Sequence, residues 1–335
     1  MDTVYKSQTQ FLDDPFYGRG CQSEEGALQS DVFPLRNVII QQCRPPHGLE
    51  VTPKRGLCGM TSSLRGVMHE DLKQKAELTL KGVVGIIIKK YFPHLAQSQR
   101  VLFEDSPCGI FLGMHIPHGD PLLVNTMMLH EIFEMGNFPF DIEGIQLDFG
   151  ETEYILICGL KVGPYVDLLH EEQGQSNSKL RARLFPYISD ARLRLKDLEE
   201  LIMSPNYLAL QDEDVVMLIQ LVFMFKGLHG WDIKIGISVA LYKLADNIDD
   251  LNRFAWGTYF WNYTSRMMRG IEFKQANPES KKGHKYTVPG FMLPFKIWIL
   301  ETFPEETKFY LCTPTEFPRM KAWRSRTPLN CDQCC

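Results

Sequence analysis

The sequence lacks a long apolar run. Its most apolar stretch, residues 215–225, is interrupted by Gln220 and is shorter than the roughly 20 residues that a helix needs to cross a bilayer. The first 18 residues mix polar, acidic and aromatic side chains and contain no apolar core of the signal-peptide type. We therefore expect an intracellular chain without a membrane span, in which the nine cysteines stay reduced.

The sequence also lacks the short motifs that mark common enzymes. It contains no phosphate-cradling Walker loop, no G-x-G-x-x-G after a strand and no G-x-S-x-G. The run from His130 to Glu134 is not H-E-x-x-H, because its fifth residue is glutamate and the second imidazole is missing. We expect that the chain is not an enzyme and has no catalytic residues and no cofactor.

A metal site has little support from the spacing of sulfur and imidazole ligands. The tail contains one C-x-x-C, from Cys331 to Cys334, but no second pair lies nearby. We expect that the chain has no metal ligands. The thiols of the tail are expected to be free. Two alternatives stay open, a metal in the turn at residues 115–120 and a cysteine–histidine pair; their residues are His115, His118, Asp120, Cys108, Cys158, His130 and His229.

The charge balance argues against a strong grip on nucleic acid. The formal net charge is -5, whereas a duplex-binding protein usually carries a basic excess. Trp256, Phe260 and Tyr263 follow helical spacing, which favours a core stripe over rings that stack on bases. The local basic residues that could contact a nucleic acid are Lys281, Lys282, Lys285, Arg319, Lys321 and Arg324.

The predicted fold is mainly α with a small β-hairpin, in the α+β class. Residues 1–65 read as a disordered arm, 66–325 as a helix-rich domain and 326–335 as a flexible cysteine-rich tail. Alternating apolar residues over 138–149, with a turn at Gly144, predict the hairpin. Polar loops are expected at 170–179 and 278–286, and helices at 71–88, 121–133, 151–158, 195–203, 212–225, 233–248, 254–268 and 291–302.

Four ordered blocks carry a resemblance to a plant family. They are residues 159–163 after the hairpin and a short helix, 246–257, 290–298 and 318–323. Together they resemble the plant domain-of-unknown-function family numbered nineteen eighty-five, over about residues 90–325, and more distantly the plant mobile domain. Ala255 stands where that family usually has proline, and Cys158 where it commonly has threonine. The motif residues, which we expect to be structural, are Gly159, Leu160, Gly163, Asp246, Trp256, Gly257, Trp298 and Trp323.

The resemblance implies a context and no active site. Members of this family often precede a SUMO-type cysteine protease domain in genes related to Mutator-like transposons, and the sequence ends at Cys335 without such a domain. We therefore expect a non-catalytic interaction or scaffold module with a protein partner and no membrane contact, in the nucleus rather than the cytoplasm. The alternatives are a nucleic-acid-binding module and a truncated relic of a protease-bearing protein.

Overall fold

The computed structural model describes residues 77–80, 84–114, 121–132, 137–142, 144–168, 178–188, 193–269, 271, 285–303 and 310–325. All of these residues belong to the unit Ile39–Cys335. The predicted arm over 1–65, the boundary that follows it and the tail over 326–335 lie outside the described residues. The same holds for most of the polar loop expected at 170–179.

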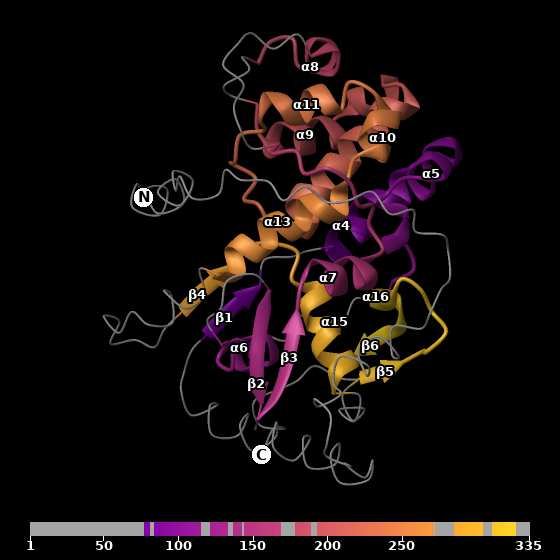
Figure 1. The fold of residues 1–335 in the computed structure, drawn as a ribbon. Helices are drawn as coiled ribbons and strands as arrows, with labels where there is room; N and C mark the ends of the chain where they lie inside the picture. Colours follow the sequence, from indigo (N-terminus) through magenta and orange to yellow (C-terminus); the bar gives the residue numbers. More distant parts are fainter. Residues whose placement is uncertain are drawn as a thin grey trace. The chain divides into compact units, whose positions relative to one another are not determined.

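Helices dominate the part of the chain that the structure describes (Figure 1), which confirms the mainly helical prediction. The α-helices are α4 (Val84–Tyr91), α5 (Gln97–Glu104), α6 (Pro121–Met128), α7 (Glu151–Cys158), α8 (Lys179–Leu184), α9 (Leu195–Ile202), α10 (Asp212–Val222), α11 (Val239–Leu244), α12 (Ile248–Arg253), α13 (Trp256–Arg269), α15 (Leu293–Thr302) and α16 (Arg319–Ala322). Short 3-10 turns are η2 (Phe92–His94), η3 (Gly109–Phe111) and η5 (Pro205–Ala209), and η6 (Phe223–Leu228) is a π-helix.

The strands are short and form two-stranded sheets. β1 (Glu77–Leu80) pairs in parallel with β4 (Lys285–Val288), and β5 (Tyr310–Cys312) pairs antiparallel with β6 (Trp323–Ser325). The predicted hairpin is confirmed as β2 (Phe138–Ile142) and β3 (Ile145–Phe149), with Phe140 opposite Leu147. Gly144 adopts a φ of 82° in its turn, a conformation that glycine reaches without steric cost.

The helix α7 has the predicted boundaries for two local reasons. At its start, the Glu153 carboxylate accepts a hydrogen bond of 2.9 Å from the Gly150 amide. At its end, Gly159 takes a left-handed φ of 68°, and its amide donates to the Ile155 carbonyl. The helix lies beside α15 (Figure 1) and also contacts α13 and α16. Three other helices therefore pack against this short helix.

An aromatic core joins the hairpin to α15. Phe149 from β3 packs 4.9 Å from Phe295 and 5.2 Å from Trp298, measured between ring centroids, and Phe140 from β2 lies 5.5 Å from Trp298. Trp261 from α13 contacts Phe149 from another side. All five rings are buried. Close-packed aromatic rings of this kind give the fold much of its apolar burial.

The apolar run over 215–225 forms the buried helix that its composition predicts. Every residue from Asp214 to Val222 in α10 is buried, and the chain continues directly into the π-helix η6. Gly227 in η6 has Val84 and Ile87 of α4 as close neighbours, which brings these two helices together. The prediction of a single α-helix over 212–225 missed this change of helical type.

The prediction of a helix over residues 71–88 is wrong at residues 77–80, and α4 begins only at Val84. These residues form β1, whose partner β4 lies far along the chain. The polar loop predicted over 278–286 is wrong for the same reason, since Lys285 and Tyr286 belong to β4. Local helix propensity is a weak preference, and a long-range backbone pairing overrides it here.

Two further helices differ from their predictions. The helix predicted over 233–248 is absent at 233–238, where Gly236 makes an isolated bridge with Arg194, and α11 and α12 follow as separate short helices. The side chains of Ser238 and Asn247 cap their first turns. The helix predicted over 121–133 ends at Met128, because Ile132 pairs with the outer edge of β2 through the Pro139 carbonyl.

Candidate functional site

The cysteine thiols that the structure describes are mostly buried. Cys108 and Cys158 are inaccessible to solvent, and Cys312 is half-buried. Burial raises the pKa of Cys108 well above its usual value and raises the pKa of Cys158 to about 12. Because the thiolate is the nucleophile and the metal ligand, protonated thiols of this kind are inert at neutral pH.

The candidate histidines do not gather with these thiols in the described structure. His115, His118 and Asp120 lie outside the described residues, so the metal alternative at that turn stays a prediction. His130 is half-buried, and its Nδ1 lies 2.9 Å from the Thr126 carbonyl oxygen. Among the described residues, no group of three or more His, Cys, Asp and Glu side chains could hold a metal ion.

A fully buried imidazole sits in a box of aromatic rings. The His229 ring lies 4.0 Å from Tyr263 and 4.8 Å from Phe260, measured between centroids, and stacks on Phe225. Neither ring nitrogen has a hydrogen-bond partner among the described residues. Burial alone lowers the pKa of His229 to about 3, so the ring is neutral at pH 7. No substrate can reach it in this conformation.

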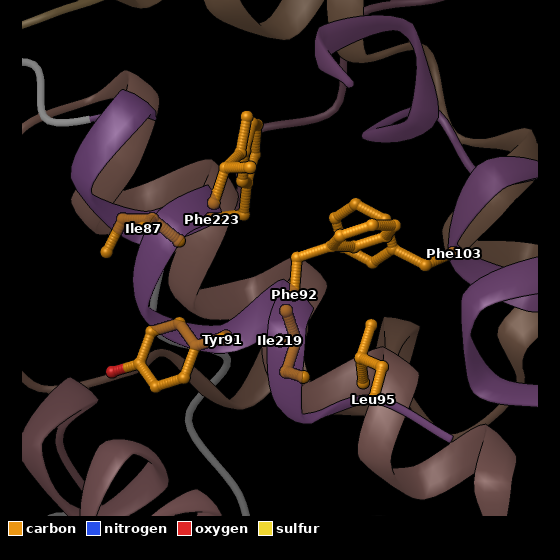
Figure 2. A pocket seen from close by; sticks show the side chains of 8 residues that line it. Ile87, Tyr91, Phe92, Leu95, Phe103, Ile219 and Phe223 are labelled. Carbon is orange, nitrogen blue, oxygen red and sulfur yellow. The ribbon is translucent and has the colours of Figure 1, made fainter. Parts of the chain in front are cut away.

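The apolar cavity beneath α4 is too small for a ligand. Its volume is about 10 Å³, which is room for a single water at most. Figure 2 shows Phe92, Phe103 and Leu95 around it, with the Tyr91 hydroxyl pointing away. An apolar lining offers that water no partners. The cavity is lined by Ile87, Ile88, Tyr91, Phe92, Leu95, Phe103, Ile219 and Phe223.

The Tyr91 hydroxyl belongs to a charged cluster that the sequence did not reveal. It donates a short hydrogen bond to Glu199 of α9, whose two oxygens each lie 2.8 Å from Nζ of Lys226. Lys90 adds a third contact at 3.4 Å. Burial opposes ionisation of Glu199, but hydrogen bonds from Lys226 and Tyr91 and both lysine charges lower its pKa overall. The cluster ties α4, α9 and η6 together.

The six predicted nucleic-acid contacts do not form one basic surface among the described residues. Lys281 and Lys282 lie outside these residues, and the side chain of Lys285 is not described. Lys321 is half-buried, and Arg324 is paired with Glu316 at 3.0 Å. Nucleic-acid binding stays a prediction, with less support than the sequence offered.

Arg319 has a different environment from the one expected of a phosphate ligand. Its side chain is only 8% exposed, and its Nε donates to Glu301 at 2.8 Å. Its remaining nitrogens donate to the carbonyls of Pro314 and Glu316 and to the Cys312 sulfur. Trp323 donates to the same Glu301 oxygen at 2.7 Å. Arg319 and Trp323 therefore fix the C-terminal strands to α15.

Two of the three aromatic rings considered for base stacking are in the core. Trp256 and Phe260 are inaccessible to solvent, and Trp261 is 8% exposed. The Trp256 indole N–H donates to the Leu251 carbonyl at 2.9 Å, so its polar atom is satisfied inside the protein. The core interpretation is confirmed for Trp256 and Phe260, whereas Tyr263, the third residue of the predicted stripe, is half-buried.

The glycines of the family blocks meet at one junction. A Cβ at Gly257 would lie 2.7 Å from the Leu160 carbonyl oxygen, and the Gly257 amide donates to the Lys161 carbonyl at 2.8 Å. A Cβ at Gly159 would lie 2.7 Å from Pro318, and one at Gly163 would lie 3.0 Å from Ala255. Segments far apart in the sequence therefore approach closely because these positions carry no side chain.

The other family residues also have packing or capping contacts. Asp246 accepts hydrogen bonds of 2.7 Å from the Ser178 hydroxyl and the Leu180 amide, and so caps the start of α8. Trp298 lies in the aromatic core described above. Asp246 and Trp298 thus take part in capping and packing, and a structural role for the whole set of motif residues stays a prediction.

The segment that follows the Gly159 junction is the main exposed apolar feature of this region. Residues 161–166, called here the 161–166 segment, form neither helix nor strand. Val162 is 54% exposed, Tyr165 39% and Val166 49%, and Pro164 is exposed as well. Arg266 of α13 donates to the Tyr165 hydroxyl and lies over its ring, 5.7 Å from the centroid. The available sequence signal was apolar residues on both sides of the Gly163–Pro164 pair.

Comparison with known proteins gives no relative for this chain. No family model, curated protein or solved structure matches it. The resemblance to the plant family therefore remains a prediction that rests on the four blocks of residues. Among the described helices, none has the length and apolar character needed to span a bilayer.

Proposed function

We propose that this chain is a non-catalytic protein-interaction module. The observation that carries the proposal is the 161–166 segment, where four apolar side chains are exposed on a backbone that is fixed to α13. Exposed apolar side chains that are held in one conformation lose little conformational entropy on binding, so they favour recognition of a partner. The buried, protonated thiols and the small apolar cavity are less suited to turnover.

The relation to transposon-derived plant proteins and a nuclear location belong to the same proposal. They rest on the four family blocks and on the basic residues near the C-terminal end, not on the fold. A fluorescent fusion of the full chain should concentrate in the nucleus. An even distribution between nucleus and cytoplasm would remove the location from the proposal and leave the interaction module as it stands.

The proposed function is tested by partner binding and thiol reactivity together. Cross-linking the full chain in plant cells should identify a partner that, once purified, binds the purified chain reversibly. The Cys108→Ala and Cys158→Ala variants should keep that binding. A thiol-reactive probe should label both cysteines more slowly in the folded chain than in urea. Faster labelling in the folded chain would indicate an activated nucleophile and would overturn the non-catalytic proposal.

A further inference from the structure

The 161–166 segment runs along α13 in a fixed arrangement. The Lys161 carbonyl accepts from Gly257 in the first turn of that helix, and the Gly163 amide donates to the Thr258 hydroxyl at 3.3 Å. Further along, Tyr165 packs against Arg266. These contacts fix the backbone at the start of the segment and the Tyr165 ring further along before any partner arrives. Such preorganisation lowers the entropic cost of binding.

Two cations border the exposed apolar side chains. Lys161 and Arg266 are both exposed, and neither forms an ion pair with another described residue. Some exposed cations elsewhere are paired, for example Lys196 with Glu200 and Arg253 with Asp249, whereas others such as Lys89 and Lys234 form no ion pair with a described residue. Arg266 uses its Nε on the Asn262 carbonyl and one terminal nitrogen on Tyr165, which leaves the other terminal nitrogen for an acceptor.

We propose that the 161–166 segment and Arg266 form a docking site for a peptide that combines apolar side chains with carboxylates. This inference rests on the proposed function and names the chemistry of the partner. Tyrosine and arginine are the side chains that most often dominate binding energy at protein interfaces. Asp167 lies beside the Tyr165 hydroxyl and offsets part of the positive charge. The apolar contacts therefore carry most of the affinity, and the two cations select a partner of negative charge.

The length of α13 along which the segment runs suggests the length of the bound peptide. Nine residues of helix separate Gly257, beside Lys161, from Arg266, which corresponds to about 13 Å at 1.5 Å per residue. An extended peptide covers about 13 Å in four residues. We therefore expect at least four residues of the peptide to run along α13, with apolar side chains for the patch and an acidic side chain towards each cation. Because the patch is small, the affinity should be on the order of micromolar.

A displayed library of random 12-residue peptides, selected on the immobilised full chain, tests this inference. The selected peptides should combine acidic and apolar residues, and a synthetic fluorescent copy should bind the free chain. Tyr165→Ala and the double variant Val162→Ser with Val166→Ser should each weaken binding by about tenfold or more. Lys161→Glu and Arg266→Glu should weaken it and reduce its dependence on salt.

A matched control separates the site from general surface hydrophobicity. Leu208 in η5 is 87% exposed, so Leu208→Ser removes an apolar side chain elsewhere and should change the peptide affinity by less than about twofold. Because Val162 and Val166 are also exposed, the free energy of unfolding of their double variant should stay within about 0.5 kcal/mol of the wild type in urea denaturation.

The outcomes distinguish this inference from the proposed function. Peptides that bind the Tyr165→Ala variant as tightly as the wild type would overturn the site and leave the interaction module standing. Selection of basic peptides would overturn the stated chemistry. A labelled 20-nucleotide single strand that binds the wild type but not Tyr165→Ala would identify the patch as a nucleic-acid surface and would overturn the peptide proposal.

Discussion

At the residue scale, buried charged side chains act as clamps between elements. Arg319 shows this most clearly, because Glu301 and Arg319 are each only 8% exposed on their side chains. Removing one partner of such a pair leaves an uncompensated buried charge. We expect Arg319→Met to lower the free energy of unfolding by about 3–5 kcal/mol, measured by urea denaturation. Arg324→Met, which breaks an exposed pair with Glu316, should cost about 1 kcal/mol or less.

Arg319→Lys separates charge from geometry at the same position. Lysine keeps the charge but cannot reproduce the planar set of donors that reaches Glu301, Pro314, Glu316 and Cys312. Its loss of stability should approach that of Arg319→Met. Equal stability of Arg319→Lys and the wild type would mean that the charge alone matters. Equal costs for Arg319→Met and Arg324→Met would contradict the clamp.

At the element scale, the elements with strong local signals could be predicted from the sequence. The hairpin β2–β3 follows from alternation and a glycine turn, and α7 ends where Gly159 takes a left-handed φ. The helices α9 and α13 follow apolar periodicity, whereas α15 is an apolar run that is buried throughout from Pro294 to Leu300; all three lie within two residues of their predicted bounds. The strand pair β1–β4 could not be predicted, because its partners meet only in the folded chain.

At the candidate site, too, local features could be predicted from the sequence and long-range contacts could not. Glycine at positions 159, 163 and 257 was visible in the sequence, but the close approach of these segments to Pro318, Ala255 and each other was not. Ser178 and Asp246 were equally visible, yet their capping of α8 depends on a tertiary contact. The exposure of Tyr165 beside Arg266 required the structure, because apolar residues around a Gly–Pro pair fit a core as well as a surface.

The approach of α13 to residues 160–161 gives a prediction for the junction. In Gly257→Ala the added methyl group would lie 2.7 Å and 2.9 Å from the carbonyl oxygens of Leu160 and Lys161, so backbone must move. We expect a loss of about 1–3 kcal/mol in urea denaturation. Peptide binding at the 161–166 segment should weaken as well, because its anchor on α13 shifts.

Gly236→Ala is the matched control. Its nearest neighbour would be the Leu193 carbonyl oxygen at 3.8 Å, an ordinary contact, and its φ is not positive. It should change stability by less than about 1 kcal/mol and leave peptide binding intact. If Gly257→Ala were as stable as Gly236→Ala, the close approach of the two segments would not be a constraint on the fold.

At the scale of the whole molecule, the buried His229 should shape the acid stability of the fold. Its pKa is about 3 in the folded chain and 6.5 when unconstrained, so below pH 6.5 the unfolded state binds the proton more readily. The contribution of the neutral ring to the free energy of unfolding is fully present above pH 6.5 and is lost as the pH falls towards 3. The free energy of unfolding falls by at most about 1.4 kcal/mol per pH unit through this group. Contact of the surrounding aromatic faces with an imidazolium can offset part of that loss.

His229→Phe isolates this contribution, because phenylalanine fits an aromatic box and does not titrate. Free energies of unfolding for the wild type and the variant should be measured by urea denaturation between pH 7.5 and 4. We expect the two curves to converge, or to cross, as the pH falls, with the wild type losing more stability. The shapes are compared and not the levels, since the larger ring alters packing at every pH. Parallel curves would show that His229 stays neutral in both states or finds a partner. The acid sensitivity would then be assigned to carboxylates such as Glu199. Because its pKa is lowered in the folded chain, Glu199 loses its contribution to the free energy of unfolding as the pH falls.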